Sequence, residues 1–108
     1  MKYLKACLDE SILVCVYYGL NGERLIRRGH KLATLLDCPL YILTVDAKPY
    51  DAFDAEKSGY IETWRQLSEE LNVEEFIVKD NEKRPIQKVI NEVARDKNIT
   101  QIIVGQSA

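Results

Sequence analysis

Hydrophobic positions follow two different periods along this chain, and the switches between them predict its secondary structure. Residues 12–16 form a continuous apolar run, which predicts a strand at about 11–17 that is covered on both faces, as in a parallel sheet. Over 22–36 the apolar residues recur every three or four positions, the spacing of a helix with one buried side. Gly19, Asn21 and Gly22 lie at the junction and permit the tight turn that joins the two segments.

The same switches continue along the rest of the sequence. Pro39 ends the first helix, Asn72 can cap the second in the left-handed conformation, and Pro85 suits the first position of the third. The resulting prediction is strands at 40–45, 73–78 and 100–104, and helices at about 54–71 and 85–97. Strands that alternate with helices through short connections form a parallel sheet with right-handed crossovers. We therefore expect one open α/β sheet.

The composition places the chain among globular domains. With 108 residues, 46% of them hydrophobic and 30% charged, it is expected to form one domain, over 11–108, preceded by an N-terminal arm at 1–10. A net charge of −2 with both signs mixed along the chain gives no pull towards nucleic acid or an anionic membrane. No apolar run approaches roughly 20 residues, and residues 1–10 lack the apolar core of a signal peptide. A cytoplasmic location is therefore expected.

Few residues of this chain suit catalysis or metal binding. The three cysteines form no C-x-x-C motif and are expected to be reduced thiols, with Cys15 inside the first strand. His30 is the one histidine, and we expect it on the surface; a single imidazole excludes most metal clusters. The sequence has neither a G-x-S-x-G elbow nor an H-E-x-x-H motif, and no acid pair stands out. We therefore expect a protein that is not an enzyme.

The turn after the first strand is the first candidate binding site, because open α/β sheets bind ligands where strands end. Its backbone N–H groups, at the start of a helix, suit a phosphate, although a plain connecting turn explains the glycines equally well. Tyr17 and Tyr18 could stack on a nucleobase or cap the sheet. Gly105 directly follows the last strand and would let a ligand approach the backbone, unless residues 105–108 form a frayed terminus.

A basic stripe on the first helix is the second candidate. Arg24, Arg27, Arg28 and Lys31 share one side of that helix, since positions three and four apart are neighbours on a helix. Such a stripe fits a phosphorylated ligand or an acidic partner surface. The alternative, which is more common, is a solvated helix face on which Glu23 pairs with Arg27 or Arg28.

Two segments in particular resemble the universal-stress-protein-like domain of bacterial Kdp sensor histidine kinases. They are N-G-E-R-L-I-R-R-G at 21–29 and I-T-Q-I-I-V-G at 99–105, and the resemblance covers residues 11–108. Those osmosensitive kinases respond to potassium and control a high-affinity potassium pump. The resemblance implies a universal-stress-protein-like fold of the adenine nucleotide alpha hydrolase type that stops before the family's last helix and strand. Kinase activity is not implied, because the transmembrane, dimerisation and ATPase regions are not in this sequence.

The resemblance also implies where a nucleotide would bind. Universal stress proteins that bind nucleotides hold adenine against the backbone at the end of strand 2, here near Val45, and carry a glycine loop after strand 4, here starting at Gly105. Some Kdp sensor domains resemble binders of cyclic di-AMP, so ATP and cyclic di-AMP are the candidate ligands. This chain has Tyr17 where the nucleotide-binding proteins carry an acidic residue, and Ala108 in place of the second glycine.

Our leading hypothesis is a non-catalytic regulatory module of a potassium-responsive two-component system. Its sheet has the strand order 3-2-1-4 with helices on both faces, and a nucleotide crevice above the carboxyl ends of strands 1 and 4. Arg24 or Arg28 would reach a phosphate or a partner. The expected nucleotide-binding residues are Tyr17, Tyr18, Gly19, Val45, Gly105, Gln106 and Ser107.

The alternative is a protein-interaction or dimerisation module with no small-molecule ligand. It would dock through the face that the missing last helix leaves bare, or through the basic stripe of the first helix. Its partners would be other domains of a sensor kinase, a signalling protein or a second copy of the chain. An adenine-nucleotide hydrolase on the same fold ranks third.

Overall fold

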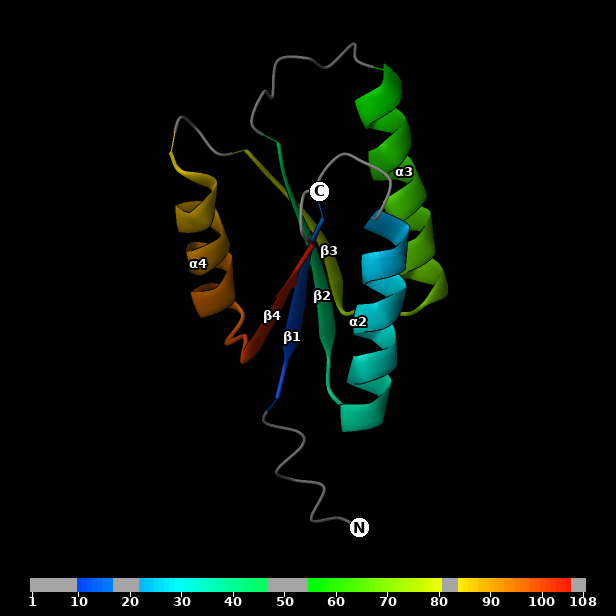
Figure 1. Cartoon of the computed structure of the whole chain (residues 1–108), viewed down its shortest axis with the longest axis vertical. Coiled ribbons are helices and arrows are strands. Elements are labelled where there is room, and N and C mark those ends of the chain that lie inside the picture. The colour runs from blue at the N-terminus through cyan, green and yellow to red at the C-terminus, as the bar shows by residue number, and fades with distance from the viewer. Residues whose placement is uncertain (1–9, 17–21, 47–54, 81–83, 106–108) are drawn as a thin grey trace.

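The residues that the structure describes form a four-stranded parallel sheet with helices on both faces (Figure 1). This computed structural model describes residues 10–16, 22–46, 55–80 and 84–105. Its elements in chain order are β1 (Ile12–Val16), α2 (Gly22–Leu36), β2 (Leu40–Asp46), α3 (Ala55–Glu70), β3 (Glu75–Asp80), α4 (Ile86–Asp96) and β4 (Gln101–Val104). The strand order is β3-β2-β1-β4 and each pairing is parallel, which confirms the predicted fold. None of these helices is long and apolar enough to cross a membrane.

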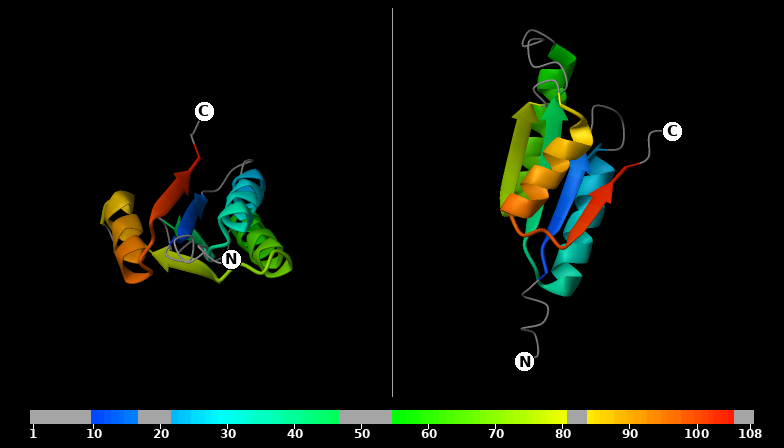
Figure 2. Two further views of the ribbon diagram at one scale, coloured as in Figure 1. Left: turned by 90° about the horizontal axis from the view of Figure 1, so that it is seen from below. Right: turned by 90° about the vertical axis from the view of Figure 1, so that its left-hand side faces the viewer.

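Hydrophobic layers lie on both faces of the sheet, with α2 and α3 on one face and α4 on the other (Figure 2). All five residues of β1 are buried. Its even-numbered residues, such as Val14, pack towards α2 and α3, whereas Leu13 and Cys15 pack towards α4. The continuous apolar run of the first strand is thereby explained, because a central parallel strand has no side that faces water.

Two glycines let α2 lie close to its neighbours. A Cβ atom at Gly29 would collide with the side chain of Val14, and one at Gly22 would lie 2.5 Å from the indole nitrogen of Trp64. Trp64 is itself buried and stacks on Tyr60, with ring centroids 5.6 Å apart. This confirms the core role predicted for the aromatic pair, and it shows that α2 reaches β1 and α3 only where side chains are absent.

The three described helices end in the same way. Asp37, Asn72 and Asn98 each have a φ of 56°, in the left-handed region that Asn and Asp tolerate better than most side chains. The residue after each of them donates its N–H to the carbonyl five positions back, as in a Schellman motif. These bonds run from Cys38 to Ala33 (3.0 Å), from Val73 to Ser68 (3.0 Å) and from Ile99 to Ala94 (2.8 Å).

The third strand begins later than the sequence predicts. The apolar pattern favours 73–78, whereas β3 spans Glu75–Asp80. Val73 is apolar, but its N–H closes α3, and the first bond to the sheet comes from the N–H of Glu74, 2.7 Å from the carbonyl oxygen of Leu40. The other elements start and end close to their predicted limits. The predicted N-terminal arm lies, apart from Glu10, outside the described residues.

Candidate functional site

The carboxyl ends of β1 and β4 lie side by side, as the predicted crevice requires. The two strands pair in parallel with Cys15 opposite Val104, so the chain leaves both strands at the same edge of the sheet. Of the predicted site residues, the structure describes Val45, Gly105, Arg24 and Arg28. The others lie outside the described residues, and their placement stays a prediction: Tyr17, Tyr18, Gly19, Gln106 and Ser107.

Gly105 lies against the first turn of α2. A Cβ atom at this position would come within 2.6 Å of Cδ1 of Leu25, a partly buried side chain of the core on that face. Glycine at 105 therefore has a packing role of its own, independent of any ligand. The contact also brings the end of β4 next to the start of α2, the two segments that are expected to flank a phosphate.

Val45 can offer a ligand its backbone but not its side chain. The side chain is buried in the hydrophobic cluster beneath α4. In the sheet, Val45 pairs with Lys79 of β3, so it lies near the carboxyl end of β2. A backbone contact at this position is what the resemblance to nucleotide-binding universal stress proteins implies.

A buried hydroxyl that the sequence reasoning missed lies one residue earlier. Thr44 is fully buried opposite Val16 of β1, and no hydrogen-bond partner of its Oγ1 lies within the described residues. Burying an unpaired hydroxyl costs free energy, so Thr44 is an unfavourable choice for packing alone. Its signal in the sequence is one polar residue inside the apolar run at 40–45.

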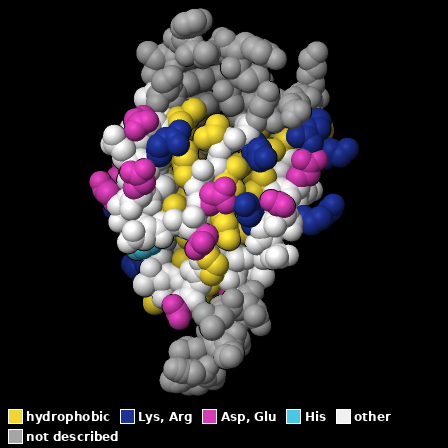
Figure 3. Space-filling model, turned by 180° about the vertical axis from the view of Figure 1, so that it is seen from behind, with side chains coloured by type: hydrophobic (Ala, Val, Ile, Leu, Met, Phe, Trp, Pro, Cys, Tyr) yellow, Lys and Arg dark blue, Asp and Glu magenta, His cyan; other side chains and the backbone are white. Residues whose placement is uncertain are grey.

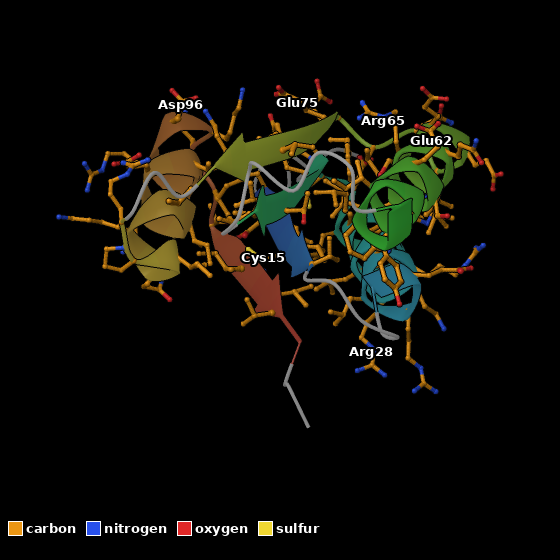
Figure 4. All side chains as sticks on the ribbon, turned by 90° about the horizontal axis from the view of Figure 1, so that it is seen from above. Cys15, Arg28, Glu62, Arg65, Glu75 and Asp96 are labelled. Carbon is orange, nitrogen blue, oxygen red and sulfur yellow. The ribbon has the colours of Figure 1, made fainter. Side chains whose placement is uncertain are left out.

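The basic stripe of α2 faces solvent. Arg24, Arg27, Arg28 and Lys31 are all exposed, and Arg28 points away from the sheet (Figure 4). Nε of Arg27 lies 3.1 Å from Oε2 of Glu23, with both side chains 55% exposed, so this ion pair is screened by solvent and contributes little to stability. The structure therefore directs Arg28 to solvent, and its contact with a phosphate or a partner stays a prediction.

The cysteine nearest the crevice is unreactive at neutral pH. Cys15 is 1% exposed, and burial raises the pKa of its thiol to about 12, since desolvation penalises the thiolate. A protonated thiol is a poor nucleophile and a poor metal ligand. Among the described residues, no group of three or more His, Cys, Asp and Glu side chains could hold a metal ion.

Two hollows that described residues line are separate from the predicted crevice. The larger, about 820 Å³, lies between β3 and α4. The smaller, about 350 Å³, lies between the end of α2 and residues 71–74. His30 borders the smaller hollow and is partly exposed there, which agrees with the predicted surface position.

Sequence comparison relates the chain to longer sensor proteins. It is 32% identical over 101 residues, 93% of the chain, to the putative sensor protein KdpD of Synechocystis sp.. It is 25% identical over 99 residues, 92% of the chain, to the sensor protein KdpD of Escherichia coli. The chain spans only 26% of the first protein and 11% of the second. No family model matches the sequence.

Structure comparison relates the fold to universal stress proteins. A protein of the universal stress protein family from Burkholderia pseudomallei superimposes with a TM-score of 0.69 at 17% identity, over 90% of this chain and 81% of that one. The universal stress protein of Archaeoglobus fulgidus gives a TM-score of 0.67 at 16% identity, over 97% of this chain and 81% of the other. At these identities the likeness is one of fold.

Proposed function

The chain is homologous to a segment of KdpD sensor proteins and has the universal stress protein fold, and we propose that it is a non-catalytic regulatory module of a potassium-responsive two-component signalling protein. In this proposal it works in the cytoplasm and binds an adenine nucleotide, with ATP and cyclic di-AMP as the candidates. Its partners are other domains of a sensor kinase or of a signalling protein. The homology supports the regulatory role, and the sheet supports the place of binding.

The nucleotide proposal rests on the pairing of β1 with β4. Two neighbouring parallel strands end at the same edge, and ligands of open α/β sheets bind at such edges. The start of α2 lies beside this edge, because Gly105 packs on Leu25, and a helix N-terminus favours a phosphate through its free N–H groups and dipole. Glu23 in that first turn repels an anion, so we expect an affinity in about the micromolar range.

Isothermal titration calorimetry with ATP and with cyclic di-AMP tests the proposal. We expect heat of binding with at least one of the two, at ligand concentrations up to the high micromolar range. Absence of heat with both ligands would remove the nucleotide and leave a regulatory module that works through protein contacts.

A pair of glycine variants tests where the nucleotide binds. Gly105→Val places a branched side chain at the exit of β4 and should weaken the affinity roughly tenfold. Gly59→Ala is the matched control, since no atom lies within 4 Å of a Cβ added to this residue of α3, and it should bind like the wild type. Equal affinities for both variants, with native circular dichroism, would place the nucleotide elsewhere.

The absence of turnover is a separate part of the proposal. The chain has no histidine beyond His30, and the pKa of Cys15, raised by burial to about 12, keeps that thiol from acting as a nucleophile. We expect no phosphate release from ATP over hours of incubation with the purified chain. Release above the rate of the buffer alone would make the chain a hydrolase.

Exposed hydrophobic side chains on β4 favour a second candidate function, a docking module without a ligand. Ile102 and Val104 are 43% and 52% exposed, although they pair with the buried Leu13 and Cys15 of β1. A group of exposed apolar side chains marks an interaction surface.

Val104→Lys tests this candidate and should abolish binding of the purified kinase region of a KdpD protein. If Val104→Lys and a charge-reversal variant of Arg28 both bind the kinase region as tightly as the wild type does, this candidate is ruled out.

A further inference from the structure

β3 forms one edge of the sheet and lies open between α3 and α4, with apolar side chains visible between charged ones (Figure 3). Val78 is 44% exposed, whereas the sequence places it at the apolar centre of its strand. Among the described strands, β3 pairs with β2 alone. We call this region the β3 edge surface; it consists of Glu75, Phe76, Ile77, Val78 and Lys79.

The backbone of β3 has hydrogen-bonding groups directed at this open edge. Peptide groups alternate between the two sides of a strand. Because the N–H of Ile12 bonds the carbonyl oxygen of Pro39, the peptide groups of Leu40 and Ile42 face β3. The pairing of Tyr41 with Glu75 then directs the peptide groups of Glu75, Ile77 and Lys79 towards β2. The N–H and C=O groups of Phe76 and Val78 therefore point outward. A strand added along this edge would satisfy all of them.

The side chains of the β3 edge surface are complementary to themselves in an antiparallel arrangement. If two copies of β3 meet about a twofold axis at Ile77, the outward peptide groups of Phe76 and Val78 face those of Val78 and Phe76 of the other copy. These are the positions that exchange hydrogen bonds in an antiparallel pair. Each Glu75 then lies opposite a Lys79 on the face that α4 covers, and each Phe76 lies opposite a Val78 on the other face.

Charged edge strands normally prevent such pairing, because like charges opposite each other repel. On this edge the two charges have opposite signs and stand at equal distances from Ile77 along the strand. The antiparallel register therefore creates two attractions and no repulsion between these positions. A shift of the register by one residue would lose both attractions and turn every side chain to the other face.

The surroundings leave the two charged groups accessible. Oε1 of Glu75 lies 2.8 Å from Nζ of Lys97 at the end of α4, yet the Glu75 side chain is 48% exposed. A carboxylate has lone pairs for a second cation. Glu75 stands between Asp96 of α4 and Arg65 of α3 at the rim of the molecule (Figure 4). The hollow of about 820 Å³ beside it, which Lys79 also lines, leaves room for the side chains of the other copy.

We propose that the β3 edge surface binds a second copy of this chain, by antiparallel pairing of β3 with β3 about a twofold axis at Ile77. The pairing joins the two sheets into one continuous sheet and covers Val78. A self-paired surface of this kind is isologous, as in most closed dimers. The inference is independent of nucleotide binding, which is expected at the carboxyl ends of β1 and β4.

Sedimentation velocity over a range of chain concentrations, up to roughly millimolar, tests the pairing. The wild type should change from monomer to dimer within that range. Lys79→Glu turns both attractions into repulsions and should raise the dimer dissociation constant roughly thirtyfold. Glu75→Lys should do the same. A wild type that stays monomeric throughout, or a Lys79→Glu variant that dimerises like the wild type, overturns the proposal.

Mixing the two variants gives the sharper result. One copy then carries lysine at 75 and 79 and the other carries glutamate at both, so every opposed pair is attractive again. The mixture should form a heterodimer with an affinity within about threefold of the wild-type dimer. If the two variants are monomeric alone and stay monomeric when mixed, the proposal is overturned.

Glu75→Lys also puts a second cation beside Lys97. If this variant does not fold, Val78→Asp, which places a charge opposite Phe76, takes its place and should be monomeric.

Val104→Lys is the matched control, since it adds a charge to the opposite edge strand. It should dimerise like the wild type. If Val104→Lys abolishes the dimer while Lys79→Glu keeps it, the copies meet through β4, and the assignment to β3 is wrong.

Discussion

Cys15 shows how the central strand sets the chemistry of a single side chain. Both faces of β1 are covered, so the thiol is removed from water and the pKa rises from 9.0 to about 12. In the unfolded chain the same thiol is solvated and keeps its ordinary pKa. The two states therefore differ in their proton content at alkaline pH, and protein stability depends on this difference.

We predict that Cys15 lowers the stability of the chain above pH 9. Below the unfolded pKa of 9.0 the thiol is protonated in both states; between 9.0 and about 12 only the unfolded state loses the proton. The free energy of unfolding should then fall by up to about 1.4 kcal/mol for each pH unit. Urea unfolding of the wild type and of Cys15→Ala from pH 7 to 11 measures this. The advantage of the wild type should shrink above pH 9, and a constant difference contradicts the account.

The sequence predicts some residues of this structure better than others. Tyr60 and Trp64 are four positions apart on an amphipathic helix, and this local spacing suffices to predict their buried contact. The exposure of Val78 and the burial of the unpaired Thr44 depend on which strand lies at an edge and which lies inside the sheet. That is a non-local property, and an apolar run looks the same in both places.

At the scale of elements, Gly29 and Gly59 lie inside helices, away from any turn, and their surroundings differ. Gly29 of α2 faces Val14, whose branched side chain cannot move away from an added Cβ, whereas Gly59 of α3 faces open space. Glycine in a helix costs about 1 kcal/mol relative to alanine when nothing opposes the replacement. The sequence alone does not distinguish the two glycines.

We predict opposite signs for alanine at these two positions. Gly59→Ala should raise the free energy of unfolding by about 0.5 to 1 kcal/mol, since it favours the helix and meets no atom. Gly29→Ala should lower it by about 1 to 3 kcal/mol, because α2 must shift away from β1. Chemical denaturation of both variants measures the two values. A stabilising Gly29→Ala would mean that α2 does not lie as close to β1 as described.

Element boundaries follow the same distinction between local and non-local causes. The left-handed cap at Asn72 is predictable from the residue type. The start of β3 at Glu75 is not, because Val73 has the apolar character of a strand residue while its N–H is used by the carbonyl of Ser68. Hydrogen bonding of the backbone, rather than hydrophobicity, decides where this strand begins.

At the scale of the whole molecule, the alternation of strands and helices and the resemblance to Kdp sensor domains were sufficient to predict the strand order. They also predict the edge at which β1 and β4 end, where Gly105 lies against Leu25. The positions of Tyr17 and Ser107 within that site stay predictions, since both lie outside the described residues. The self-complementary edge of β3 could not be foreseen, because it becomes meaningful only once β3 is known to be an edge strand.

Backbone amide chemical shifts of the isotope-labelled chain, followed during titration with ATP and with cyclic di-AMP, test the central claim most directly. The account predicts saturable changes, with at least one of the two ligands, that are largest at Val16, Val45 and Gly105, where the strands end. The amides of Ile77 and Asn98 should stay unchanged. No change with either ligand, or changes centred on β3 or on the hollow beside His30, would contradict a nucleotide site at the carboxyl ends of β1 and β4.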